Sequence, residues 1–145
     1  SSGTMSKRRA THAGSWYTDN GRKLRVQMEG WLSEVKTDSK LSACRAIIGP
    51  HAGFSYSGPT AAYAYKYMDS KTIKRVFVLG PSHHYYTDGC EVTGCKKYET
   101  PVGDLDIDTE VVDELLATGR FQKMSKRVDE DEHSIEMHLP YIAHQ

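Results

Sequence analysis

Two short apolar runs in this chain end in the same way, and this shared ending constrains the fold more than any other feature. Ala46–Ile48 and Val76–Leu79 are each followed by Gly-Pro, and histidines follow at His51 and His83. Apolar runs of this length are typical of buried strands, and Gly-Pro ends a strand because proline has no N–H for the ladder. Both histidines are therefore predicted at the C-terminal edge of an open α/β sheet, where ligands bind.

The stretch between the two histidines has the length of one strand-helix-strand crossover. Gly58-Pro59 predicts a turn, and Thr60–Met68 predicts a short helix. A right-handed crossover makes the two strands parallel, and neighbouring strands lie about 4.8 Å apart. The sequence therefore predicts a parallel strand pair at the centre of the sheet.

Such a pair would bring the side chains of His51 and His83 to one spot, while His84 points elsewhere. Two imidazoles at a sheet edge are typical of half a metal site or an acid/base site. A carboxylate as third ligand would suit iron, whereas a thiolate would favour copper or zinc. The alternative is that each histidine only caps its strand through hydrogen bonds.

Composition limits the function classes. The chain has 145 residues, of which 38% are hydrophobic and 26% charged, as in ordinary folded proteins, and its formal net charge is zero. No global basic field favours nucleic acid or an anionic membrane. No apolar stretch approaches the roughly 20 residues of a membrane span, and no signal-peptide core follows Met5. We expect a cytoplasmic location, with a nuclear one left open.

The cysteines agree with a reducing compartment. Cys44, Cys90 and Cys95 form no C-x-x-C pair, which argues against a disulfide framework and a zinc finger. We expect reduced thiols, with Cys44 packed in the first strand. Residues 1–4 ahead of Met5 are typical of a cloning remnant before an initiator, so residues 1–5 are set apart from the folded domain.

Two amphipathic helices are predicted outside the crossover. Gly21–Lys36 carries one apolar stripe, which we assign to the core. Asp108 predicts the cap of a second helix that ends at Gly119. Residues 90–98 predict no firm element, and Pro101–Asp106 predicts a loop.

Charged residues are predicted to stay at the surface. Lys7-Arg8-Arg9 falls in a stretch expected to be loose. The acidic run Asp129–Glu132 predicts the solvated start of a helix, because carboxylates favour a helix N-terminus. His133 and Glu136 follow at a spacing that places them on one helical face. We expect both to orient the cleft from a second layer around the metal rather than to act in catalysis.

Two His-Ala-Gly sequences suit a pocket wall, because each joins a histidine, a flexible turn and aromatic side chains. They begin at His12 and His51 and are followed by Trp16 and Tyr56. We expect these aromatics, with His12 and His84, to line the cleft. The alternatives are chance similarity and aromatic cover at the sheet edge.

Five sequences together resemble the Memo family, named for mediating cell motility downstream of ErbB receptor tyrosine kinases. They are HAGSWY, MEGWLS, PHAG, LGPSHH and DEDEHSIEMHLPY. Members are similar in fold to class III extradiol dioxygenases and are about twice this length. The resemblance therefore implies that residues 6–145 are the N-terminal half of one α/β domain, with a mainly parallel central sheet flanked by helices and here incomplete.

The resemblance also implies site residues. His51 and His83 would bind copper or iron, and Trp16 and Tyr56 would line the same cleft. A remaining cysteine ligand and a further histidine would lie beyond Gln145, so we expect weak metal binding by this chain alone. Animal members are associated with phosphotyrosyl receptor peptides, which implies phosphorylated receptor segments or adaptors as partners.

Three functions stay open at this point. The first is a signalling protein whose cleft binds a metal, a phosphotyrosyl segment or both. The second is a metal-dependent redox enzyme, which the dioxygenase-like fold does not by itself imply. The third is an inactive truncated isoform.

Overall fold

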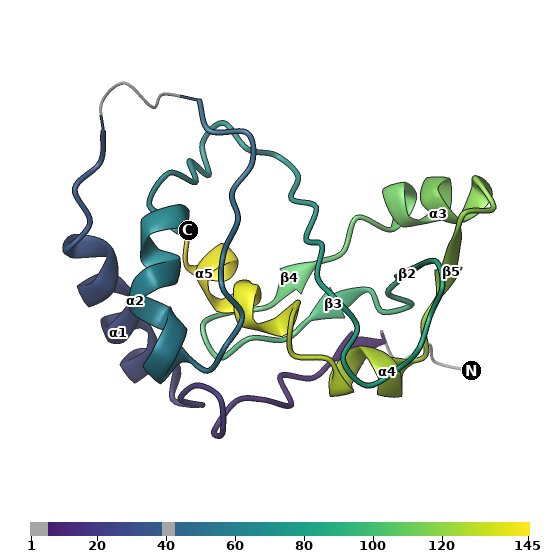
Figure 1. Cartoon of the computed structure of the whole chain (residues 1–145), viewed down its shortest axis with the longest axis horizontal. Helices are drawn as coiled ribbons and strands as arrows, with labels where there is room; N and C mark the ends of the chain where they lie inside the picture. The colour runs from purple at the N-terminus through teal and green to yellow at the C-terminus, as the bar shows by residue number, and fades with distance from the viewer. Residues whose placement is uncertain (1–5, 39–42) are drawn as a thin grey trace.

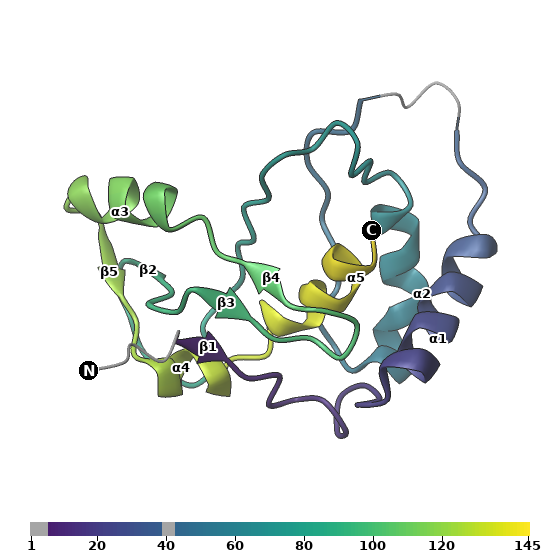
Figure 2. The same ribbon diagram turned by 180° about the vertical axis from the view of Figure 1, so that it is seen from behind.

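The computed structural model describes residues 6–38 and 43–145, which form a mixed α/β protein. Its elements are β1 (Lys7–Arg8), α1 (Gly21–Ser33), α2 (Phe54–Tyr65), β2 (Cys90–Val92), β3 (Lys97–Tyr98), β4 (Leu105–Asp106), α3 (Thr109–Ala117), β5 (Phe121–Lys123), α4 (Lys126–Asp131), η1 (Glu136–His138) and α5 (Leu139–His144). Figures 1 and 2 show α1, α2 and α5 gathered at one end and α3, β2 and β5 at the other. Residues 1–5, set apart from the domain above, lie outside the described residues.

The strands form two small sheets. In the first, β3 lies between β1, which is parallel to it, and β4, which is antiparallel. In the second, β2 and β5 are parallel. The α/β class is confirmed, but β2, β3 and β4 lie where the sequence predicted a loop or no firm element. Strands of two or three residues carry too little periodicity to be recognised.

The two apolar runs predicted as buried strands are not strands in this structure. Residues 46–48 and 76–79 pair with no strand among the described residues, and Ile48 is 98% exposed and Leu79 86% exposed. Both belong to long connections that cross the same side of the molecule (Figure 1). A strand needs a neighbour to satisfy its backbone groups, and no described segment supplies one. Cys44 is accordingly only half-buried, and its thiol contacts the carbonyl oxygen of Ala46 at 3.2 Å.

Helix α1 has the predicted core face. Its N-cap is Asn20, whose side chain accepts a hydrogen bond from the backbone N–H of Lys23 at 3.0 Å. Such a cap satisfies one of the free donors in the first turn. The helix ends at Ser33, three residues before the predicted end. Its buried residues lie at helical spacing and face α2: Leu24, Met28 and Leu32.

Helix α2 begins earlier than predicted and contains Gly58 and Pro59, which we had expected to form a turn. Packing explains the difference. A Cβ at Gly58 would lie 2.3 Å from Cζ3 of Trp31, so only glycine admits this ring. The hydroxyl of Tyr141 donates to the carbonyl oxygen of Gly58 at 2.7 Å. Contacts from two other helices thus outweigh the local turn preference.

The main core lies between α1, α2 and the C-terminal helices. Its fully or largely buried residues are Tyr17, Leu24, Met28, Leu32, Val35, Phe54, Ala61, Ala62, Tyr65, Met137 and Tyr141. Helix α3 packs on β5 at the far end and is capped as predicted, since the Asp108 carboxylate accepts from the N–H of Val111 and Gly119 has a φ of +72°. No helix among the described residues is long and apolar enough to cross a membrane.

Arg8 and two residues of the acidic run, Asp129 and Glu130, are buried, although the sequence predicts them at the surface. Arg8 has no exposed surface and pairs with Asp129 at 2.9 Å and with Glu136 at 2.5 Å. Arg9 pairs with the buried Glu130 at 2.9 Å. The acidic run therefore ends α4 and anchors β1, instead of opening a solvated helix. Buried charges persist only when paired in this way.

Candidate metal centre

The two Gly-Pro segments that lead to His51 and His83 meet because the segment that joins α4 to α5 packs against both. The hydroxyl of Ser134 donates to the carbonyl oxygen of Pro81 at 2.7 Å, and a Cβ at Gly80 would lie 2.6 Å from that hydroxyl oxygen. A Cβ at Gly49 would lie 3.0 Å from Cε1 of His138. An added side chain would therefore displace Ser134 at Gly80 and crowd His138 at Gly49. The predicted convergence is found, but side-chain packing produces it rather than a parallel strand pair.

Three imidazoles come together at this point. His51, His83 and His133 each offer a ring nitrogen, and these atoms all lie within 4.8 Å of one another. The ring centroids are 5.4 Å apart for His51 and His83, 5.6 Å for His51 and His133, and 4.2 Å for His83 and His133. Neutral imidazole nitrogen is a common ligand of transition metals. The cluster therefore has the composition of a metal site.

Glu132 fixes the position of His83. Its carboxylate accepts from the backbone N–H of His83 at 2.5 Å and contacts Nδ1 of the same residue at 2.8 Å. Burial opposes its ionisation, but hydrogen bonds from Ser134 and His83 lower the pKa of Glu132 to about 2. The ionised carboxylate places a proton on Nδ1 of His83, which leaves the lone pair on Nε2 for a ligand.

His133 is sandwiched between two rings. It stacks on His83, with planes 25° apart, and on Trp16, with centroids 4.3 Å and planes 26° apart. Its Nδ1 is buried and makes no hydrogen bond to any described residue, and the Glu132 oxygen 3.7 Å away is too distant for one. Burial, together with the neighbouring His83, lowers the pKa of His133, so the ring is neutral at pH 7.

Glu136 lies beneath the cleft and anchors the loop that carries Trp16. Its fully buried carboxylate accepts from Arg8, from the backbone N–H of His12 at 2.8 Å and from the hydroxyl of Tyr17 at 3.2 Å. The ring of His12 lies edge-on to Trp16 at 5.6 Å. This position suits the predicted orienting role. Glu136 opens the short helix η1, and the carbonyl oxygen of the preceding His133 accepts from the backbone N–H of Met137 at 3.0 Å, as in a helical turn.

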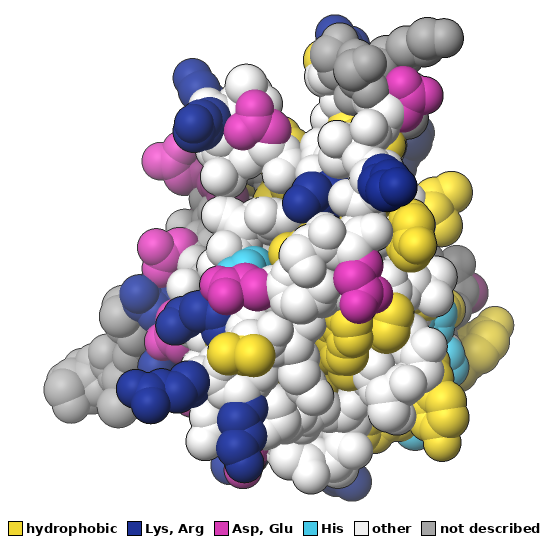
Figure 3. Space-filling model, turned by 90° about the vertical axis from the view of Figure 1, so that its left-hand side faces the viewer, with side chains coloured by type: hydrophobic (Ala, Val, Ile, Leu, Met, Phe, Trp, Pro, Cys, Tyr) yellow, Lys and Arg dark blue, Asp and Glu magenta, His cyan; other side chains and the backbone are white. Residues whose placement is uncertain are grey.

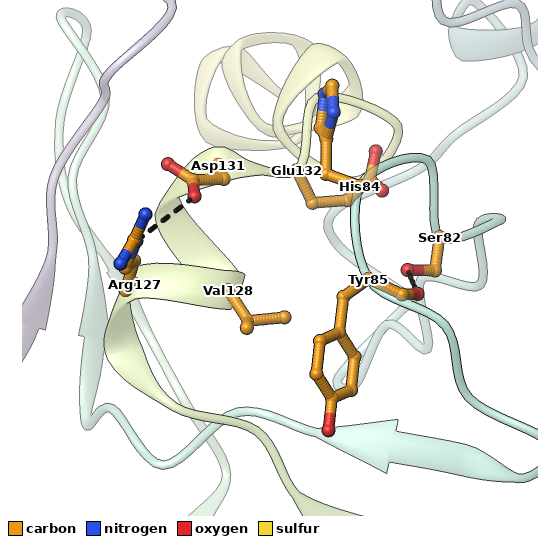
Figure 4. A pocket seen from close by; sticks show the side chains of 7 residues that line it. All are labelled: Ser82, His84, Tyr85, Arg127, Val128, Asp131 and Glu132. Carbon is orange, nitrogen blue, oxygen red and sulfur yellow. Dashed lines mark hydrogen bonds and ion pairs between the residues drawn. The ribbon is translucent and has the colours of Figure 1, made fainter.

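His84 lines a pocket together with Glu132 (Figure 4). The pocket has a volume of about 280 Å³ and is lined by Ser82, His84, Tyr85, Arg127, Val128, Asp131 and Glu132. Arg127 pairs with Asp131 at 3.8 Å, as the dashed line in Figure 4 marks. His84 is not one of the three residues whose ring nitrogens cluster, but its ring lies edge-on to that of His133, with centroids 6.3 Å apart.

The cleft is open to solvent. Tyr56, predicted to line it, is 84% exposed in the first turn of α2, and its side chain makes no ring contact or hydrogen bond with the three described histidines. His83 is also exposed. In Figure 3, hydrophobic side chains gather towards the right-hand side of the face, where histidine side chains also reach the surface.

Sequence reasoning missed Glu132 as a site residue. It stood within a run of four acidic residues, and a run of like charges is typical of a solvated surface. The available signal was its place directly before His133 in a chain that also carries tandem histidines at 83 and 84. A carboxylate beside a candidate ligand is the usual partner of a ligating imidazole.

The fold and the site define a class: a mixed α/β protein with a histidine cluster where the Gly-Pro segments before His51 and His83 meet. The chain belongs to the Memo-like protein family, whose model matches residues 8–145. This match confirms the resemblance found in the sequence and extends it to include the buried Arg8.

Relatives in several animals are identical to this chain at about half of the aligned positions. Protein MEMO1 of Homo sapiens is 52% identical over 136 residues, which cover 94% of this chain and 45% of that protein. Protein MEMO1 of Danio rerio is 52% identical over 142 residues, covering 98% and 47%. Protein memo-1 homolog of Caenorhabditis elegans is 51% identical over 136 residues, covering 94% and 38%. The chain thus spans less than half the length of these relatives.

Proposed function

We propose that this chain carries the metal-binding cleft of a Memo-type signalling protein that acts in cell motility downstream of receptor tyrosine kinases. The metal is copper or iron, bound at His51 and His83. Membership of the family supports the signalling role. The proximity of the ring nitrogens, all within 4.8 Å, supports the metal role and is the observation on which it depends.

The charges around the cleft favour a cation. Glu132 stays ionised beside His83, whereas the deeper Glu136 and Asp129 are both paired with Arg8. The guanidinium of Arg127, which lines the neighbouring pocket, is paired with Asp131. A phosphotyrosyl group at the imidazoles would face Glu132 without a free arginine, whereas arginine is the usual phosphate partner. Phosphopeptide binding therefore belongs to a second surface of the proposed signalling protein.

A redox enzyme is the second candidate function, and the openness of the cleft favours it. His83 is exposed, so a metal held there would keep positions open for a small molecule. A bound copper or iron ion would supply electron transfer to O₂ or superoxide. The dioxygenase-like fold expected from the resemblance belongs to this proposal too, and a catechol is the substrate to assay.

Titration calorimetry with Cu²⁺ and Fe²⁺ tests the metal role. We expect one site per chain that is lost in both His51→Ala and His83→Ala, with melting temperatures of the metal-free variants close to that of the parent. Binding retained in both variants would contradict the proposal. Turnover of a catechol by the loaded protein would favour the enzyme over the signalling role.

A further inference from the structure

We propose that His133 is a third metal ligand, so that His51, His83 and His133 bind a divalent transition-metal ion through three imidazoles. This inference rests on the proposed function, since it concerns the same cleft. It also moves His133 from the second layer, where the sequence placed it, to direct contact with the ion.

The distances allow three bonds after a small closure. A tetrahedral site with bonds of about 2.1 Å places its ligand nitrogens about 3.4 Å apart. The nitrogens of the cluster lie within 4.8 Å of one another, so each ring has to move inward by roughly 1 Å. His51 has this freedom, because its ring makes no hydrogen bond to a described residue. The stack of His133 on His83 opens as the rings turn towards the ion.

The unsatisfied nitrogen of His133 is an independent observation that points to a ligand. Its Nδ1 is buried, and no described residue hydrogen-bonds to it. A buried polar atom without a partner loses its hydration without compensation. A metal bond, or a water bound to the metal, would satisfy this ring, and a purely structural stack between Trp16 and His83 does not.

The surroundings hold two of the three rings in place. Glu132 contacts His83 through both its backbone N–H and Nδ1. Ser134, which follows His133, has no exposed surface and is fixed to Pro81. Trp16 covers one face of the His133 ring. Fixed rings lose little freedom on binding an ion, which raises affinity.

The donor set selects the class of metal. Three neutral nitrogens suit Zn²⁺, Cu²⁺ and other borderline divalent ions, whereas Cu⁺ prefers sulfur. Cys44, Cys90 and Cys95 do not belong to the cluster in the described part of the chain. Three protein ligands leave a fourth position for water or a small molecule. Cu²⁺ is the best probe, since it binds nitrogen sites most tightly in the divalent series.

The test compares His133→Phe with the parent chain. Phenylalanine keeps a ring between Trp16 and His83 and removes both nitrogens, so the stack and the fold are preserved. His144→Ala is the matched control, because His144 lies at the end of α5 and is outside the cluster. Cu²⁺ affinity is measured by calorimetry, and pulsed EPR counts the imidazoles on the bound ion.

We expect His133→Phe to weaken Cu²⁺ binding by more than the roughly 10- to 100-fold that follows loss of an outer partner, and to remove one imidazole from the EPR signal. His144→Ala should change neither quantity. An unchanged imidazole count in His133→Phe overturns this inference, whatever the affinity, and leaves the His51 and His83 site standing. Absence of Cu²⁺ binding by the parent overturns both.

Discussion

The guanidinium of Arg8 donates to Oε1 of Glu136 at 2.5 Å, and neither side chain has any exposed surface. Arg8 also donates to Asp129. This buried group links the first strand to the two segments that flank the imidazole cluster. A buried charge without its partner is strongly destabilising, so Arg8 is the residue on which the C-terminal part of the site depends most.

We expect Arg8→Met to lower the free energy of unfolding by about 3–5 kcal/mol, because it leaves two buried carboxylates uncompensated. Urea denaturation followed by circular dichroism measures this loss. Lys7→Met is the matched control, since the neighbouring Lys7 pairs with Asp104 at the surface and should leave the stability nearly unchanged. Equal losses of unfolding free energy in the two variants would show that the buried ion pairs of Arg8 stabilise the protein no more than the surface pair of Lys7.

Glu132→Gln should weaken Cu²⁺ binding by about 10- to 100-fold, because the neutral amide orients His83 less firmly and makes its Nε2 less basic. Calorimetry at constant pH measures the change. Asp131→Asn is the control: Asp131 faces Arg127 in the neighbouring pocket and does not touch His83. If both variants bind copper as the parent does, the carboxylate of Glu132 has no part in preparing the site.

Stability should fall as the pH drops below about 6.5, in part through His138. Burial, with a smaller effect of His51, lowers the pKa of His138 from its ordinary value of 6.5. The unfolded chain then binds a proton that the folded chain does not, so unfolding becomes easier between pH 6.5 and the lower, folded-state pKa. In metal-free buffer, His138→Gln should reduce this dependence.

Tyr65→Phe is the control for the pH experiment. It removes the hydrogen bond of 2.5 Å between the Tyr65 hydroxyl and Nδ1 of His138 but keeps the titrating ring. We expect a less stable protein that retains the pH dependence of the parent. A parent whose unfolding free energy is the same at pH 7.5 and pH 5.5 would contradict the assignment.

Two leucines distinguish the observed fold from the predicted strand pair. Leu24 is fully buried on α1, and Leu24→Ala should lower the free energy of unfolding by about 2–5 kcal/mol. Leu79 lies in a run predicted to be a buried strand but is 86% exposed, so Leu79→Ala should leave stability almost unchanged. Chemical denaturation of both variants measures this. A comparable loss of unfolding free energy in Leu79→Ala would favour the predicted buried strand over the observed exposed connection.

Two helical glycines should respond oppositely to alanine. Gly58→Ala places a methyl group against the Trp31 ring and should destabilise the protein by about 1–3 kcal/mol. Gly30 on α1 has no atom within 4 Å of an added Cβ, so Gly30→Ala should stabilise by about 0.5–1 kcal/mol through helix propensity. Thermal melting gives both signs. Stabilisation by Gly58→Ala would mean that the ring does not pack as described.

Local sequence signals gave the elements whose stability is local. The stripe of α1, the Asp108 cap and the Gly119 end of α3 are found as expected, because capping and helical periodicity act over a few residues. The convergence of His51 and His83 was also predicted. Family membership followed from short motifs and needed no coordinates.

Tertiary structure alone decided the features that join distant segments. Arg8 lies in the interior only because Asp129 and Glu136, more than a hundred residues away in the sequence, pair with its guanidinium. His133 joins the other two imidazoles only because Ser134 packs against the Gly80-Pro81 segment that precedes His83. Charge and periodicity along the chain describe each segment alone, whereas the burial of a residue depends on which distant segment packs against it. The sequence by itself therefore determined α1, α3 and two of the three imidazoles, and packing between distant segments decided the course of α2, the buried charges and the third imidazole.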